Sequence, residues 1–158
     1  MAITTFSGPV KSNAGFISGT ESVSASVTSA TLAVTSDYNG QTIPLNKADG
    51  MVVTLPAATG SQAVYRFLIG TATTSNNYVI QVANATDVMN GLASVGGTTA
   101  SVFGTLPASD TITMNGSTTG GLAGSYVEVK DIASGDWLVS AALVGSGTPA
   151  TPFSAAVS

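Results

Sequence analysis

Apolar and polar positions alternate most clearly in residues 124–144, GSYVEVKDIASGDWLVSAALV. Val127 and Val129 fall on one side of an extended chain, whereas Glu128 and Lys130 fall on the other. A period of two residues is typical of a strand with one buried and one solvated face. The segment therefore predicts a strand that begins near Tyr126.

A turn and a second strand follow in the same segment. Residues 132–135 form a short loop, in which we expect Gly135 to adopt a positive φ. Residues 136–144 are nearly uncharged, so we expect them to return as a strand that lies deeper in the sheet. A hairpin alone is marginally stable in water, so this one must pack on further strands.

Further strands are predicted along the chain by shorter apolar runs between turn residues. They are residues 41–45, 51–55, 63–70, 78–83 and 110–115. The first two of these predict a second hairpin, and residues 92–109 predict a long loop with one weak strand at 101–103. About nine short strands, spaced about ten residues apart, favour an all-β fold, an antiparallel β-sandwich or barrel.

The alternation changes phase near Ser29. Apolar residues occupy odd positions from Val23 to Val27 and even positions from Ala30 to Val34. One inserted residue would restore the pattern, so we expect a β-bulge or a strand break there.

Both ends of the chain predict extended arms around a single β domain. Residues 1–20 and 146–158 are rich in Gly, Pro, Ser and Thr, and residues 21–145 form the domain. The candidate contact residues in the arms are Thr4, Phe6, Val10, Phe16, Ile17 and Phe153. Two interpretations stay open. The arms fold back and cap their own domain, or they are extended segments that add to the edge of a partner's sheet.

Composition narrows the classes of function. The 158 residues are 44% hydrophobic but only 8% charged, with four basic and eight acidic side chains. Four cations form no basic stripe for nucleic acid or anionic lipid. No apolar stretch is long enough for a transmembrane helix, and the first residues do not resemble a secretory signal. A weakly charged surface suits a component packed into an assembly, or a protein exposed outside cells, better than a cytosolic enzyme.

The sequence contains no histidine and no cysteine. It therefore lacks the commonest general base, the commonest metal ligand and any thiol nucleophile. Carboxylate pairs are the remaining route to catalysis. Asp131 and Asp136 flank one turn, where they form either an acid pair or calcium site, or simply two solvated carboxylates at a strand end. We expect no enzyme activity, no cofactor and no small-molecule substrate.

Several phrases together resemble one family. They are Thr54-Leu55-Pro56 with Gly60, Tyr65-Arg66-Phe67, Tyr78-Val79-Ile80-Gln81-Val82, Thr111-Ile112-Thr113-Met114-Asn115-Gly116, Gly124 with Val127-Glu128-Val129, and Gly135-Asp136-Trp137-Leu138-Val139. This order is similar to that of β-rich virion proteins of tailed bacteriophages, in particular the capsid decoration or cement proteins. A related order of motifs occurs in phage tail-fibre modules.

The resemblance implies a structural virion protein that binds the lattice of the major capsid protein on the outside of the capsid, commonly as a homotrimer. It implies no cofactor and no catalysis. The arm residues would contact the capsid or a neighbouring copy. The alternative is a tail-fibre or adhesin module that binds host glycans through loop tips such as those around Tyr38, Asp87 and Asp110.

Overall fold

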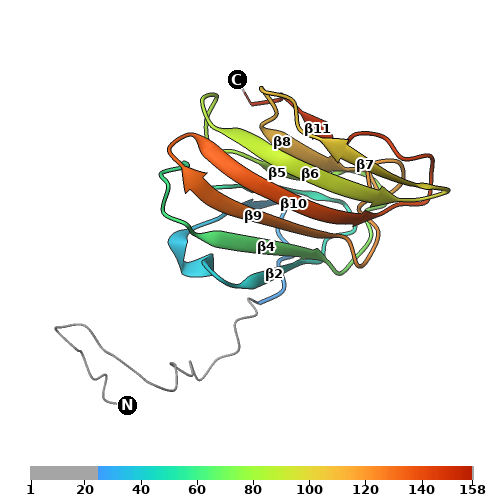
Figure 1. Ribbon diagram of the computed structural model, residues 1–158. Helices are drawn as coiled ribbons and strands as arrows, with labels where there is room; N and C mark the ends of the chain where they lie inside the picture. The colour runs from blue at the N-terminus through green and yellow to red at the C-terminus, as the bar shows by residue number, and fades with distance from the viewer. Residues whose placement is uncertain (1–24, 158) are drawn as a thin grey trace, which may run out of the picture.

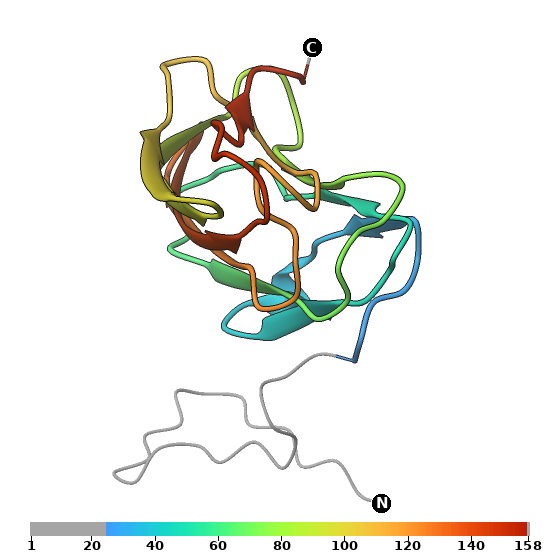
Figure 2. The same ribbon diagram turned by 90° about the vertical axis from the view of Figure 1, so that its right-hand side faces the viewer.

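The computed structural model describes residues 25–157, which form two β-sheets packed face to face (Figures 1 and 2). The six-stranded sheet has the order β2 (Thr42–Leu45), β4 (Val64–Ile69), β9 (Tyr126–Ala133), β10 (Asp136–Val144), β6 (Val88–Gly96) and β7 (Ala100–Gly104). The five-stranded sheet has the order β1 (Thr31–Ala33), β3 (Met51–Thr54), β5 (Tyr78–Gln81), β8 (Thr111–Met114) and β11 (Phe153–Ser154). A short 3-10 helix, η1 (Ser36–Tyr38), joins β1 to β2.

The predicted all-β sandwich is confirmed, but its strands are more numerous and its pairing is mixed. The pairs β1–β3, β3–β5, β2–β4 and β6–β10 are parallel. Between β2 and β6 the chain passes to the other sheet after every strand. Strands two apart in sequence therefore run the same way and become parallel neighbours. The predicted antiparallel pairing was wrong for three of the four parallel pairs for this reason, and β6–β10 is a parallel pair between strands farther apart in the sequence.

The same alternation between sheets overturns the second predicted hairpin. β2 and β3 occupy nearly the predicted residues, yet they lie in different sheets and share no ladder. Residues 46–50 therefore form an arch across the sandwich. Gly50, with φ 76°, lies so close to the backbone of Asn77 that a Cβ there would overlap its carbonyl oxygen.

The core lies between the inner faces of the two sheets and follows the predicted alternation. In β10 every second residue is buried, from Trp137 to Leu143. Trp137 is fully buried and packs against Tyr65 of β4, with ring centroids 5.9 Å apart. Large side chains of the facing sheet, among them Ile80 and Ile112, are also fully buried. One continuous core thus joins the sheets.

The hairpin of β9 and β10 confirms the clearest sequence pattern. Val129 pairs with Val139, the register shifts between Asp136 and Trp137, and Gly135 in the turn has φ 82°. Near Ser29 the predicted strand break is present. Val27 bridges to Leu45 of the six-stranded sheet, whereas β1 pairs with β3 in the other sheet.

Residues 92–109, predicted as a long loop with one weak strand at 101–103, contain most of the nine-residue strand β6 and the five-residue strand β7, which includes the predicted weak strand. β6 and β7 form an antiparallel hairpin in which Leu92 pairs with Gly104 and Gly96 with Ala100. The prediction missed β6 because glycine, serine and threonine are frequent here, and these residues favour turns. In this hairpin they occupy strand positions beside buried Ala93 and Val95.

Candidate functional site

Asp131, one of the two candidate carboxylates, lies near the C-terminal end of β9, where it is only 2% exposed. The loop that follows β3 folds around its side chain. The N–H of Gly60 donates to Oδ1 at 2.7 Å, the N–H of Ser61 donates to Oδ2 at 2.9 Å, and the N–H of Thr59 lies 3.1 Å from both oxygens. The hydroxyl groups of Ser61 and Thr59 also donate to Oδ2, at 2.7 and 3.2 Å.

The backbone of this loop is turned so that several of its N–H groups point toward the same carboxylate. Gly60 has φ 79°, and Gln62 has φ 63°, a left-handed conformation that is uncommon for a residue with a side chain. The loop is held beside β9 by main-chain bonds as well, because the N–H of Gln62 donates to the carbonyl of Asp131 at 3.0 Å.

The hydrogen bonds decide the charge of Asp131. Burial raises the pKa of its carboxyl, but the hydrogen bonds from Ser61, Gly60 and Thr59 lower it by more, so that the pKa falls from 3.8 to about 2. Burial, together with the charge of Asp131, raises the pKa of the nearby Tyr65 hydroxyl. Asp131 is therefore ionised at neutral pH, and its carboxylate accepts hydrogen bonds from one loop of its own chain.

Asp136 does not join Asp131. Trp137 pairs with Asp131 across the hairpin, so both side chains point to the inner face of the sheet. Asp136 precedes Trp137 and points outward, where its Oδ1 accepts a hydrogen bond from Asn90 at 3.0 Å. The proposed acid pair is therefore absent. The interpretation as two solvated carboxylates was also wrong, because Asp131 is buried.

Asp87 and Asp110, predicted as loop-tip residues of a glycan-binding module, are buried as well. Asp87 is 4% exposed and accepts the N–H of Ala58 at 2.9 Å. Asp110 is 6% exposed and accepts the N–H groups of Ala156 and Val157 at 2.8 and 3.2 Å. Like Asp131, each ties a loop or the C-terminal segment to a strand. They do not face solvent, where a ligand would bind.

The candidate arm residues divide into two groups. Thr4, Phe6, Val10, Phe16 and Ile17 lie outside the described residues. Phe153 lies in β11, which pairs with β8, and it is 8% exposed within the core of its own domain. For the C-terminal segment, the structure thus supports the interpretation that the arm caps its own domain.

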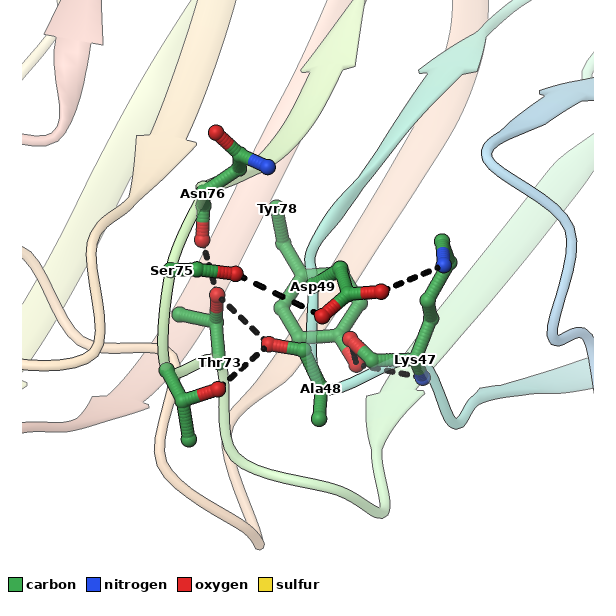
Figure 3. A network of polar contacts seen from close by, with 8 residues as sticks. Lys47, Ala48, Asp49, Thr73, Ser75, Asn76 and Tyr78 are labelled. Atoms are coloured by element: carbon green, nitrogen blue, oxygen red, sulfur yellow. Dashed lines mark hydrogen bonds and ion pairs between the residues drawn. The ribbon is translucent and has the colours of Figure 1, made fainter.

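An open hollow of about 390 Å³ lies at the start of β3, between Ala30 and the loops at residues 47–50 and 76–77. Its two charged side chains already bind each other (Figure 3). Lys47 Nζ lies 3.1 Å from Asp49 Oδ2, and Ser75 Oγ lies 3.5 Å from Asp49 Oδ1. Because its two charges neutralise each other, this hollow has no evident preference for a charged ligand.

Tyr78 holds the base of this network together. Its hydroxyl accepts the N–H of Lys47 at 2.8 Å and lies 2.7 Å from the carbonyl of Lys47 and 2.9 Å from that of Thr71. Burial raises the pKa of Tyr78, against the opposing effect of Lys47. The hydroxyl therefore stays protonated and structural at neutral pH.

The outer face of the six-stranded sheet is the broadest surface with a distinct character. Its charged side chains are Arg66 on β4, Glu128 and Lys130 on β9, and Asp136 at the first position of β10. Arg66 Nε contacts Glu128 Oε2 at 2.7 Å. Beyond Asp136, the outward positions of β10 up to Val144 and of β6 from Asn90 to Gly96 carry no charge. They are Leu138, Ser140, Ala142 and Val144 on β10, and Asn90, Leu92, Ser94 and Gly96 on β6.

Sequence reasoning missed this surface, because most of β6 was assigned to a loop. A usable signal was present, since residues 88–109 contain no charged side chain. That run indicates a surface whose burial requires no dehydration of an ion.

Within residues 25–157, no three or more acidic side chains gather closely enough to bind a metal ion. No helix in this part of the chain has the length and apolar character needed to cross a membrane.

No family model matches the chain, and neither a curated protein nor a solved structure matches it.

Proposed function

We propose that this protein is a structural component of a bacteriophage virion, which binds the lattice of the major capsid protein on the outside of the capsid and stabilises it. The resemblance of its strand and turn phrases to capsid decoration proteins suggests this role. The observation that carries it is the uncharged part of the outer face of β10 and β6, beyond Asp136, where Leu138 and Val144 remain 45% and 42% exposed.

This face suits attachment to a large, repeating partner. Several of its side chains are small, such as those of Ser140, Ala142 and Ser94, so they project little from the sheet. Covering it dehydrates hydroxyl groups but no ion, so the penalty on binding is small. Each copy needs only a modest affinity, because a lattice that binds many copies is stabilised by the sum of their contacts.

The buried carboxylates are consistent with a structural role. Asp87, Asp110 and Asp131 each accept main-chain N–H groups from loops or from the C-terminal segment. A group held in this way positions backbone and does not turn over a substrate.

Binding to shells tests the proposal. Expanded capsids that lack this protein are mixed with the full chain, sedimented, and assayed for bound protein. Ser140→Glu and Ala142→Lys place opposite charges on exposed positions of β10 and should each weaken binding at least tenfold. Thr31→Lys, on exposed β1 at a distant edge of the other sheet, is the control and should bind as wild type. Wild-type occupancy by both β10 variants would overturn the proposed contact, and virions without this chain would overturn the function.

A further inference from the structure

Three exposed apolar side chains gather at one margin of the six-stranded sheet. In residues 25–157 the most exposed large apolar residues are Leu92, Val102 and Leu106, at 59, 66 and 74%. Leu92 lies over Gly104 of β7, where an added Cβ would be 3.6 Å from its Cδ2. Val102 is on the same strand, and Leu106 follows its end. Together these residues form an apolar margin along β7.

β7 is also an edge strand without the usual protection. Its inner side pairs with β6, and no other strand of residues 25–157 pairs with its outer side. Such an edge presents unpaired N–H and C=O groups, which native proteins commonly protect with charges, proline or a covering segment. β7 contains neither a charge nor a proline.

The opposite edge of the same sheet is protected. β2 contains Pro44, which has no N–H, and the carbonyl of Pro44 accepts the N–H of Val27 at 2.8 Å. The chain segment before β1 therefore covers β2. The two edges differ in the way expected if only β7 receives a partner strand.

A hollow of about 140 Å³ adjoins β7. Its walls come from Gly104, Leu106, Ala108, Ser109, Thr151, Phe153, Ser154 and Ala155. It lies between the end of β7 and β11, the edge strands of the two sheets. Its volume is below the range of small-molecule sites and suits an apolar side chain of a bound segment.

We propose that residues 1–24 of a neighbouring copy add a strand to the outer edge of β7 and place an apolar side chain in this hollow. That segment carries Phe6, Val10, Phe16 and Ile17 and only two charged side chains, Lys11 and Glu21. An extended segment binds a free edge through main-chain hydrogen bonds, while pockets for alternate side chains give selectivity.

The position of Ala25 favours a neighbouring copy over the same copy. The described chain begins beside β2, on the other side of the molecule from β7 (Figure 2). Five strand spacings separate the two edges, about 24 Å. A segment that returned to its own β7 would first cross a face of the sandwich, which orders backbone without any strand pairing to offset the lost entropy.

Copies arranged head to tail avoid that crossing. The segment leaves the β2 side of one copy and meets the β7 edge of the next, which is a heterologous contact. Such contacts close into a ring when the rotation between copies permits it, and a ring of three gives the homotrimer that the resemblance implies. This contact goes beyond the proposed attachment to capsid, because it forms between copies in solution.

Disulfide cross-linking of the full chain tests this pairing directly, because the natural sequence has no cysteine. Val102→Cys is mixed with Phe6→Cys, Val10→Cys or Phe16→Cys under mild oxidation. At least one mixture should give a mixed dimer on a non-reducing gel, above the level of each variant alone. Thr31→Cys replaces Val102→Cys as the matched control and should give none. Absence of any mixed dimer above this control overturns the proposal.

The double variant Phe16→Cys/Val102→Cys distinguishes the two sources of the segment. Pairing between copies gives cross-linked dimers and trimers, whereas pairing within one copy gives only a cross-linked monomer and overturns the proposal. Light scattering after size exclusion supplies a second readout. Wild type should be a trimer, Val102→Lys should dissociate at least tenfold more readily, and Thr31→Lys should behave as wild type. A trimer unaffected by Val102→Lys contradicts the β7 contact, whatever the outcome of capsid binding.

Discussion

The N–H of Gly60 donates to the carboxylate of Asp131 across 2.7 Å, although the two residues lie 71 positions apart in the sequence. The contact fastens the loop after β3 to the end of β9. This loop connects β3 of the five-stranded sheet to β4, which pairs with β9 in the six-stranded sheet. Asp131 therefore holds the connection between the two layers at one end.

Replacing Asp131 with asparagine should destabilise the fold by about 3 kcal/mol. The substitution removes the charge that several N–H and hydroxyl groups share and turns one amide donor toward them. Urea unfolding measures the change. Asp37→Asn, at an exposed position in η1, is the control and should change stability by less than about 0.5 kcal/mol. Equal effects of the two substitutions would contradict the role of Asp131.

The lowered pKa of Asp131 predicts an acid-sensitive contribution to stability. With a pKa of about 2 in the folded state and about 3.8 when unfolded, the unfolded state binds more protons between these values. The contribution of about 2 kcal/mol is complete above pH 4 and is lost as the pH falls through 2. Unfolding of wild type and Asp131→Asn should therefore differ most at pH 5 and converge toward pH 2. A difference that does not change over this range would contradict the assignment.

Gly91→Ala should destabilise the protein by at least about 3 kcal/mol. Gly91 has φ 152°, and a Cβ there would overlap the carbonyl oxygen of Val139 on neighbouring β10. Gly124 has φ 91° but open space around it, so Gly124→Ala carries only backbone strain, about 1 kcal/mol. Thermal unfolding of the two variants separates steric overlap from strain. If Gly124→Ala is the more harmful, the packing of β6 on β10 is misassigned.

Tyr78→Phe should cost about 1–3 kcal/mol, because the N–H of Lys47 and two carbonyl groups lose a buried partner. Hydrogen exchange at the amide of Lys47 should accelerate together with the loss of stability. Tyr126→Phe is the matched control, since the hydroxyl of Tyr126 contacts charged side chains, including Glu128 at 3.3 Å, and no main-chain group of the arch. Unchanged exchange in Tyr78→Phe would mean that another group holds the arch after β2.

How much of the fold could be predicted from the sequence depends on whether the interacting residues lie close together in the chain. The hairpin of β9 and β10 was predictable because a period of two and a glycine turn are local, and Val129 and Val139 lie ten positions apart. The same reasoning failed for β2 and β3. Their alternation shows which side chains face the core, but it does not specify which strand lies alongside, and a short connection serves an arch as well as a hairpin.

For the candidate sites the limit is similar. Asp131 was interpreted as solvated because it adjoins a turn, and no residue close to it in the sequence indicates that a distant loop covers it. Phe153 looked like an anchor because its neighbours are turn-forming residues, yet β11 pairs with β8 and buries it. The lack of charge in residues 88–109 was visible throughout, but its meaning depended on finding β7 at an edge.

The sequence by itself determined that the chain is built of strands and which faces of the clearest strands are buried, since these follow from the spacing of neighbouring residues. It also fixed the absence of histidine and cysteine chemistry. Only the tertiary structure decided the order of the strands, the burial of three carboxylates and the open edge at β7. Each of these depends on segments tens of residues apart meeting in space, and that outcome is set by the packing of the whole core.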